Sequence, residues 1–303
     1  MSRLTADELA HFRTEGFLVA HQIIPPPVIF AVQDEISRAV DEQARALQAA
    51  GKLSDVRADL GFLHRTTALY QQCPDILRPV SNGTHAGPAL FRLLTCPDLL
   101  DVVEQLMGPE IVASSVYRIR PKLPFWPNGE VPWHQDSGYF HTMGDAHLIL
   151  TVWVPLMDAT VETGAMEVIP RSHRDGVRRH FWATVSAPGL TVHPDHLPDT
   201  PPVPVPANVG DAVLMTNLTV HHSTPNTSGR IRWAADLRYN PPAAGNYYPY
   251  EAEFIARSPS RPDTVLRDWR AFRELRRTHQ PNGVVDRTWK KQPDETFIKP
   301  IRL

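Results

Sequence analysis

The sequence has very little cysteine, no long apolar run and no excess of charge of either sign. Cys73 and Cys96 are the only thiols among 303 residues, which excludes a disulfide framework, and neither belongs to a metal-binding cysteine pair. No apolar stretch approaches the ~20 residues that a membrane-spanning helix needs. The 31 basic and 33 acidic residues nearly balance, which leaves no basic footprint for nucleic acid.

These absences indicate the broad class of protein. An apolar share of 42% is enough to build a sizeable core. The N-terminal segment MSRLTADELAHF is charged and helix-like, and it lacks the basic and then apolar pattern of a signal peptide. We therefore expect a globular protein of a reducing, cytoplasmic setting that acts on a small molecule, with no nucleic-acid or membrane partner.

Helices are expected near the two ends of the chain and strands between them. Thr5 and Glu8 fit a capping box that opens a short helix, and apolar residues recur with a helical period over residues 28–50 and 97–107. Residues 52–84 look irregular. From residue 111 the pattern changes to short strands without intervening helices, which is typical of an antiparallel sandwich or barrel. The expected strands cover residues 17–20, 111–120, 148–156, 164–169, 212–216 and 230–239, and a last helix covers residues 265–277.

The chain contains no internal repeat and no convincing linker. We therefore predict a single domain of residues 1–303 that is mainly β with flanking helices. Its N-terminal helices occupy about residues 1–110, its β core about residues 111–240, and a C-terminal helical extension about residues 241–303.

The most informative pattern is a histidine and an aspartate two residues apart, His134 and Asp136. On a strand, residues i and i+2 point to the same face, so both side chains can reach one ion. A distant strand must supply a third ligand, and His221 is the best candidate, with the adjacent His222 as the alternative. Two histidines and one carboxylate form a facial triad, which is typical of non-haem Fe(II) oxygenases.

A histidine and an aspartate at this spacing are a weak signal by themselves. The same pair occurs where a histidine at a strand end contacts a solvated aspartate. The remaining histidines have no partner at ligand spacing. We expect ordinary surface residues at His64, His85, His180, His193, His196 and His279.

Three blocks of sequence in a fixed order resemble one family. They are WHQDSGY at residues 133–139, VWVPL and ETGAMEVIPRSH between residues 152 and 173, and HHSTPNTSGRIR at residues 221–232. Together they resemble the phytanoyl-CoA dioxygenase (PhyH) family. The opening of the chain is also similar to the usual start of that family, so the resemblance extends to about Tyr239.

This resemblance implies a double-stranded β-helix, a cupin-like jelly roll that uses Fe(II), 2-oxoglutarate and O2. The offsets of Ser223, Asn226 and Arg232 after the distal histidine favour His221 as the third metal ligand beside the first two. Arg232 matches the arginine that binds the distal carboxylate of 2-oxoglutarate, as a planar guanidinium can do with two hydrogen bonds. Ser223 would add a hydroxyl group to that carboxylate, and Trp153 would wall the pocket.

From the residues alone, each of these roles has an alternative. Arg232 could be a surface arginine of its strand, as Arg230 and Arg238 could be. Ser223 could hydrogen-bond within its own turn, and Trp153 could belong to the core.

Three further positions bear on the pocket. Lys122 precedes the first block where relatives often carry a basic residue, and we predict a solvated loop lysine there. The family commonly has glycine at the positions of Arg171 and His222. Arg171 therefore puts a charge on a loop that is normally small, and His222 keeps the choice of the third ligand open.

The resemblance implies that 2-oxoglutarate is decarboxylated to succinate while a substrate C–H bond is oxidised. Because Asp136 is a carboxylate, halide has no vacant protein position at the iron, so we predict hydroxylation, with desaturation as the other outcome. No basic cluster suggests a CoA carrier, which favours a free small or medium-sized metabolite. The residues expected to frame the substrate pocket are Tyr139, His141 and Phe125, with Trp126, Phe181 and Trp182 in the same flanking segments.

Two other classes of function are compatible with parts of this pattern. A zinc-dependent hydrolase could use the same triad with a bound water, but it would not need Arg232 at its spacing. A non-catalytic jelly-roll ligand-binding protein would keep the fold without the triad.

Overall fold

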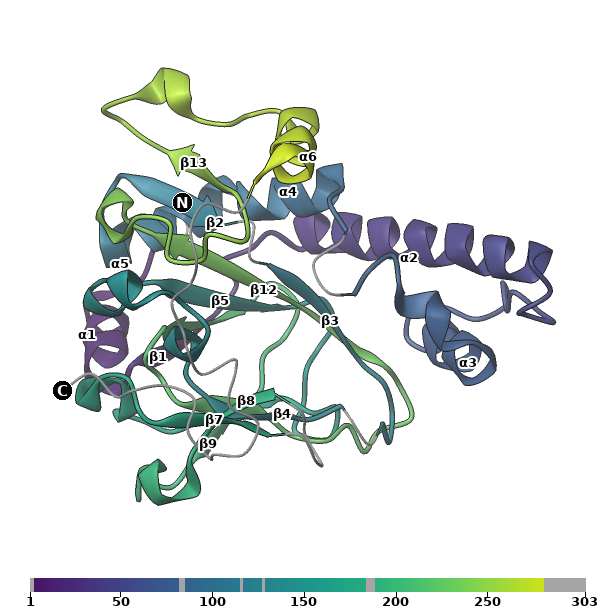
Figure 1. The fold of residues 1–303 in the computed structure, drawn as a ribbon, viewed down its shortest axis with the longest axis horizontal. Helices are drawn as coiled ribbons and strands as arrows, with labels where there is room; N and C mark the ends of the chain where they lie inside the picture. Colours follow the sequence, from purple (N-terminus) through teal and green to yellow (C-terminus); the bar gives the residue numbers. More distant parts are fainter. Residues whose placement is uncertain (1–2, 82–84, 115–116, 127–128, 184–188, 281–303) are drawn as a thin grey trace.

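The centre of the molecule consists of two facing antiparallel sheets (Figure 1). The computed structural model describes residues 3–81, 85–114, 117–126, 129–183 and 189–280. The larger sheet has the order β1-β10-β5-β12-β2-β13, and β3 also pairs with β12. Its strands are β1 (Phe17–Ala20), β2 (Ile111–Ser114), β3 (Arg118–Lys122), β5 (Leu150–Pro155), β10 (Ala212–Thr216), β12 (Arg232–Asn240) and β13 (Glu253–Arg257).

The smaller sheet has the order β4-β11-β6-β9, and a separate hairpin of β7 and β8 lies next to β4. All of these pairs are antiparallel. Two facing antiparallel sheets with helices outside them confirm the predicted jelly-roll class. The strands are β4 (Val131–His134), β6 (Met166–Val168), β7 (His180–Ala183), β8 (Gly189–Val192), β9 (Val203–Val205) and β11 (His221–Ser223).

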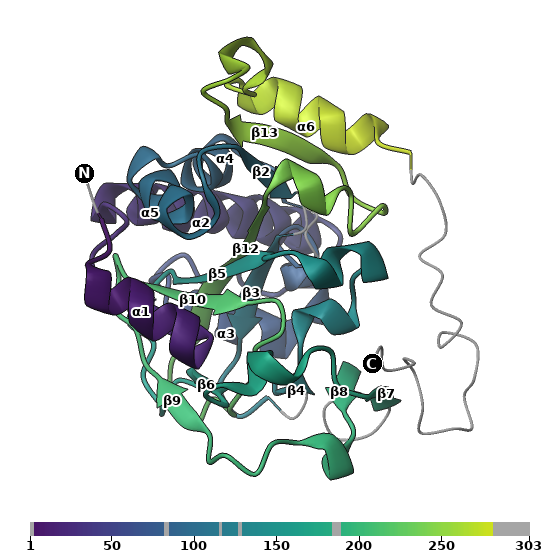
Figure 2. The ribbon, with the colours of Figure 1, turned by 90° about the vertical axis from the view of Figure 1, so that its left-hand side faces the viewer.

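Helices cover the outer face of the larger sheet (Figure 2). In α2 the apolar residues recur every three or four positions, so Ile29, Val32 and Ile36 are all buried on one side. They join α4 and α5 in the main hydrophobic core, to which β5 and β12 also contribute. The helices are α1 (Ala6–Glu15), α2 (Pro26–Ala49), α3 (Arg65–Gln72), α4 (Pro88–Leu94), α5 (Pro97–Met107) and α6 (Trp269–Thr278).

Strand β12 separates this core from the space between the sheets. Its side chains alternate, as in any strand, so Trp233, Leu237 and Tyr239 pack into the core under the helices. Arg232 and Arg238 point to the opposite face and line a cavity between the sheets. The alternation of one strand therefore supplies both the core and one wall of the candidate site.

Several predicted elements are confirmed and others differ. The capping box at Thr5 and Glu8 is present, and the helix over residues 97–107 and the strand over residues 212–216 have the predicted bounds. The single strand predicted over residues 111–120 is divided into β2 and β3, with residues 115–116 outside the described part.

The prediction that residues 52–84 are irregular is wrong, because α3 lies there. This helix has only eight residues and buries just two of them, which is too short for a periodic signal. The part of the predicted C-terminal helical extension that the structure describes, residues 241–280, is not wholly helical either, since it includes β13, which pairs with β2. Residues 281–303 of that prediction lie outside the described residues. Within the described residues, no helix is long and apolar enough to cross a membrane.

Candidate metal centre

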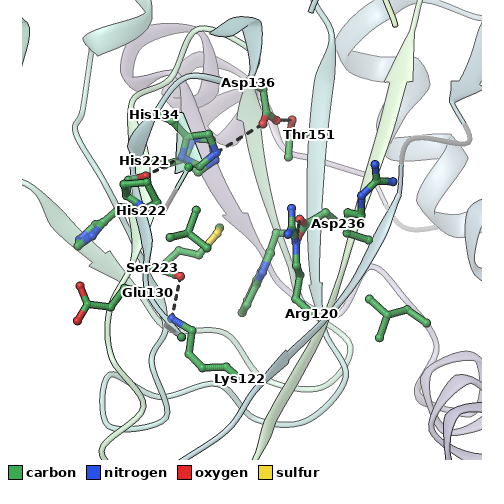
Figure 3. Close-up of a pocket in the computed structure, with 18 of the residues that line it drawn as sticks. Arg120, Lys122, Glu130, His134, Asp136, Thr151, His221, His222, Ser223 and Asp236 are labelled. Carbon is green, nitrogen blue, oxygen red and sulfur yellow. Dashed lines mark hydrogen bonds and ion pairs between the residues drawn. The ribbon is translucent and has the colours of Figure 1, made fainter. Parts of the chain in front are cut away.

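The histidine and aspartate of the first block and the distal histidine meet at one point between the sheets (Figure 3). His134 ends β4 and His221 begins β11, and these two residues face each other in the antiparallel register. Asp136 follows in a short 3-10 turn. One donor atom from each of the three side chains lies within 4.8 Å of the others, and all three residues are buried. Such a donor set suits a divalent metal ion of intermediate softness.

The local backbone structure that positions Asp136 differs from the predicted strand. Strand β4 ends at His134, so the two residues do not share a strand face. The turn Asp136–Gly138 brings the carboxylate back toward the histidine instead, with 3.8 Å between His134 Nε2 and Asp136 Oδ1. The spacing was informative although the strand geometry assumed for it is wrong.

Backbone carbonyl groups orient both imidazole rings. The Nδ1 atom of His134 is 2.8 Å from the Pro132 carbonyl oxygen, and the Nδ1 atom of His221 is 2.9 Å from that of Thr219. A ring nitrogen that donates to a carbonyl group carries the proton, so Nε2 has the free lone pair that binds a metal. Burial, followed by the nearby His221, lowers the pKa of His134, which keeps its ring neutral.

Asp136 is held by a buried arginine. The Nη2 atom of Arg238 lies 2.9 Å from Asp136 Oδ1, its Nε atom lies 3.2 Å from Oδ2, and the Thr151 hydroxyl also donates to Oδ2. Burial alone would raise the pKa of Asp136, but the charge of Arg238 and its hydrogen bonds outweigh this effect and lower the pKa below its ordinary value. Arg238, to which the sequence assigned no role and for which a surface position was considered, is therefore a missed residue of the site.

His222 does not compete with His221 for the metal position. Its Nε2 atom lies 2.8 Å from Glu167 Oε2, and its ring stacks on Trp133 with 3.8 Å between the ring centroids. Figure 3 shows the His222 ring directed away from His134, Asp136 and His221. The geometry thus identifies His221, and not His222, as the candidate third ligand, a choice that the sequence left open.

His180 is also placed differently from the prediction. It is fully buried, not at the surface. Its Nδ1 atom lies 2.8 Å from the Arg178 carbonyl oxygen, and its Nε2 atom accepts a hydrogen bond of 3.1 Å from the Gln135 backbone N–H group. His180 therefore supports the backbone between the two ligands of the first block.

Arg232 lies on the cavity wall and lacks partners for most of its guanidinium group. Its side chain comes from β12, and the residue is only 2% exposed. Nη2 donates to the Gly164 carbonyl oxygen at 3.1 Å, whereas Nε and Nη1 have no hydrogen-bond partner among the described residues. The guanidinium carbon is 5.3 Å from the centre of the buried Trp153 ring. Buried unpaired donors are costly, and an anionic ligand in the cavity would supply the missing acceptors.

Lys122 faces Arg232 across the pair of strands β3 and β12. The prediction of a solvated loop lysine is wrong, because Lys122 is buried. Its Nζ atom donates to Ser223 Oγ at 2.8 Å and to the Thr224 carbonyl oxygen. Burial, and next the charge of Arg232, lower the pKa of Lys122 to about 6. The alternation of Arg118, Arg120 and Lys122 was the signal of a strand face that the loop prediction missed.

The comparisons with known proteins agree with this arrangement. The family model of phytanoyl-CoA dioxygenase (PhyH) matches residues 12–234. The chain belongs to the PhyH family. Phytanoyl-CoA dioxygenase domain-containing protein 1 of Danio rerio is 26% identical over 264 residues, which cover 77% of this chain and 88% of the relative. The peroxisomal phytanoyl-CoA dioxygenase of Homo sapiens is 22% identical over 240 residues, or 78% of this chain and 68% of the relative.

Solved structures support the PhyH fold as well. The apo form of the non-heme monooxygenase ThoJ has a TM-score of 0.56 and 20% identity, over 86% of each chain. The non-heme alpha ketoglutarate dependent carbocyclase SnoK from nogalamycin biosynthesis has a TM-score of 0.52 and 22% identity, over 78% of this chain and 84% of that one.

As a PhyH member, the chain is a non-haem iron enzyme that depends on 2-oxoglutarate and uses O2 as cosubstrate. Family membership therefore favours oxygenase chemistry over the zinc-hydrolase and ligand-binding alternatives.

The cavity of this PhyH protein has a volume of about 740 Å³ and is lined by both sheets. Tyr139 lines it as predicted, and its hydroxyl accepts a hydrogen bond of 3.2 Å from the Leu190 N–H group. Phe125 does not line the cavity. It lies at a left-handed backbone position (φ 50°), the residue is 71% exposed, and the next residue, Trp126, lines the cavity instead. His141 is also absent from the lining, because its ring caps a short 3-10 helix by accepting from the Met143 N–H group.

Arg171 and Phe181 lie outside the cavity lining as well. The guanidinium of Arg171 pairs with Glu15 at the surface, so the charge at this position is not directed at the pocket. The side chain of Trp182, also predicted near the pocket, lies outside the described part of the molecule.

Proposed function

We propose that this PhyH enzyme hydroxylates a C–H bond of a small or medium-sized metabolite, with Fe(II) bound by His134, Asp136 and His221. The observation that carries the proposal is the buried guanidinium of Arg232, which has two unpaired nitrogens on the cavity wall beside the triad. A hydrolase with the same triad has no use for such a group. A dicarboxylate cosubstrate does, because its distal carboxylate can accept both hydrogen bonds.

The side chains that line the cavity have different roles in this proposal. Arg232, Lys122 and the Ser223 hydroxyl would bind the distal carboxylate of 2-oxoglutarate, and Trp153 packs beside Arg232. Arg238 fixes the Asp136 carboxylate. When bound, the iron and 2-oxoglutarate would supply the oxidising chemistry with O2 as the oxidant, in which one oxygen atom of O2 goes to succinate, CO2 is released and the other oxygen atom oxidises a substrate C–H bond. Because Asp136 occupies the third protein position, halide would find no vacancy there, which favours hydroxylation over halogenation.

Succinate formation tests the proposal. Purified protein given Fe(II), 2-oxoglutarate and O2 is expected to produce succinate slowly even without substrate, and zinc in place of iron is expected to give none. His221→Ala should lower the rate to the level measured without added iron, because one imidazole ligand is lost. His222→Ala is the matched control, since His222 is directed away from the triad, and it should retain iron binding. Equal rates in the two variants would contradict the proposed ligand set.

A second prediction concerns Lys122 and the number of protons that the protein takes up when 2-oxoglutarate binds. At about pH 8 the buried amine is largely neutral, because its pKa is lowered to about 6. A carboxylate placed beside it favours the charged ammonium form and raises this pKa. Binding of 2-oxoglutarate to the iron-loaded protein under nitrogen is therefore expected to take up close to one proton, and the affinity should fall as the pH rises.

Calorimetry at about pH 8 in two buffers of different ionisation enthalpy measures this uptake. Lys122→Met should abolish it, whereas the exposed Lys52, which pairs with Asp75, gives a control in Lys52→Met. Proton uptake that persists in Lys122→Met would remove Lys122 from the cosubstrate site.

A further inference from the structure

Strand β3 presents a row of basic side chains to the cavity. Residues two apart on a strand share a face, so Arg118, Arg120 and Lys122 lie on one face of β3 and all line the cavity. Ile119 between them is buried and belongs to the main hydrophobic core. The predicted absence of a basic cluster is therefore wrong. The three basic residues do not form a continuous run in the sequence, because an apolar residue separates each from the next. They come together only as one face of a strand.

The positive charge of the cavity exceeds what the metal centre and the cosubstrate require. Among the described lining residues, five have basic side chains and three are carboxylates. Lys122 and Arg232 face the proposed cosubstrate position, and Arg238 is paired with Asp136. An Fe(II) ion and a 2-oxoglutarate dianion would neutralise each other. Arg118 and Arg120 therefore remain as cations without a function in the proposed reaction.

The acidic groups near these two arginines are few. Arg120 Nε donates to Asp236 Oδ2 at 2.7 Å, and Arg118 Nη2 lies 3.7 Å from Glu251 Oε1. Glu251 is shared, because Arg276 lies 3.7 Å from its other oxygen. Arg118 also donates to the Tyr117 carbonyl oxygen at 2.8 Å. The remaining lining acid, Glu130, is exposed.

Arg120 has the geometry of a ligand-binding arginine. Its contact with Asp236 uses only Nε, and in the described part of the chain the structure gives its two terminal nitrogens no hydrogen bond. The side chain is 45% exposed, so it can be reached from the cavity. Figure 3 shows Arg120 and Asp236 across the pocket from His134 and His221. Asp236 thus holds the Arg120 guanidinium through Nε, and the two terminal nitrogens of Arg120 remain available to a ligand in the cavity.

We propose that Arg120, with Arg118 beside it, binds an anionic group of the substrate, either a carboxylate or a phosphate monoester. The inference rests on the proposed function, since the oxidised C–H bond belongs to the same molecule. Leu77, Trp126 and Phe140 also line the cavity and offer apolar surface for the rest of that molecule. The substrate class is therefore an organic acid with an apolar body, held by its charged end away from the metal ligands.

Matched ligands test this inference without knowledge of the natural substrate. The probes are octanoate, octyl phosphate and the neutral octanamide, titrated by calorimetry into protein loaded with Fe(II) and saturating 2-oxoglutarate under nitrogen. At least one of the two anions is expected to bind about tenfold or more tightly than the amide, because a charged hydrogen-bond partner is gained. The tighter anion of the two identifies carboxylate or phosphate as the recognised group.

Variants of Arg120 assign the effect to this residue. Arg120→Gln should remove the preference for the anion, and Arg120→Lys, which keeps the charge, should retain part of it. The exposed Arg45 on α2 provides the control Arg45→Gln, for which the preference should be unchanged. Circular dichroism checks that each variant is folded.

Several results would overturn the inference. They are equal binding of amide and anions, no binding of either anion, an unchanged preference in Arg120→Gln, and competition of the anion with 2-oxoglutarate, which would place it at Arg232. Failure of the proposed function is seen separately. If no succinate forms but the preference still depends on Arg120, the anion site stands and the oxygenase proposal fails. Normal succinate formation without any preference defeats only the anion site.

Discussion

Replacing Arg232 with alanine is expected to weaken 2-oxoglutarate binding by about 2 to 3 kcal/mol, the scale of losing hydrogen bonds to a charged partner. This corresponds to a roughly 30- to 140-fold higher Kd. The effect is large because Arg232 is buried, and two of its nitrogens have no protein partner among the described residues. Titration of 2-oxoglutarate into Fe(II)-loaded protein under nitrogen, followed by the weak visible charge-transfer absorption of the complex, measures it.

Arg230→Ala is the matched control for this variant. Arg230 lies two residues earlier, outside the cavity lining, and its hydrogen bonds with Asn226 and Ser228 are made by its backbone. Its removal should leave the Kd unchanged. If both variants bind 2-oxoglutarate with the Kd of the unmodified protein, Arg232 is not the cosubstrate arginine. The buried guanidinium of Arg232 then no longer supports the proposed function.

Replacing Arg238 with methionine is expected to lower the free energy of unfolding of the metal-free protein by about 3 to 5 kcal/mol. The substitution leaves the Asp136 carboxylate buried without its cationic partner, and an uncompensated buried charge is costly. A divalent metal ion bound at the triad restores a positive charge next to that carboxylate. Chemical denaturation should therefore show a large loss of stability without metal and a partial recovery with Fe(II) or Mn(II) present.

Two further variants separate charge from packing at Arg238. Arg238→Lys keeps a cation and should lose less stability than Arg238→Met. The double variant Asp136→Asn, Arg238→Met removes both charges and should be more stable than Arg238→Met alone, because no unpaired carboxylate remains. A double variant no more stable than the single one would show that Arg238 acts through packing, for example against Phe140, rather than through its charge.

The position of the metal centre follows from short-range patterns in the chain. His134 and Asp136 are two residues apart, and the order of residues after His221 distinguishes it from most other histidines. The alternation of polar and apolar residues in β12 likewise predicts a strand with one face in the core. These features are local, so they are visible without the fold.

Errors arose where the answer depends on a partner that is distant in the chain. Nothing near Lys122 or Arg238 in the sequence indicates burial, because the groups that hold them, Ser223 and Asp136, are about one hundred residues away. Phe125 has the apolar character of a pocket residue, but its backbone turn directs it to solvent. The side on which a residue lies at a turn or strand end is decided by pairing and turn geometry.

Residue types, their spacing and the resemblance to the PhyH family were thus sufficient for the jelly-roll class, for His134 and Asp136 as metal ligands and for Arg232 as the candidate cosubstrate arginine. The packing of two sheets decided the rest. It selected His221 over His222 by the direction of the rings, buried Arg238 against Asp136, and brought the basic row of β3 to the cavity. The physical reason is that a buried charge is stable only with a partner, and the partner of Arg238, Asp136, lies about one hundred residues away in the chain.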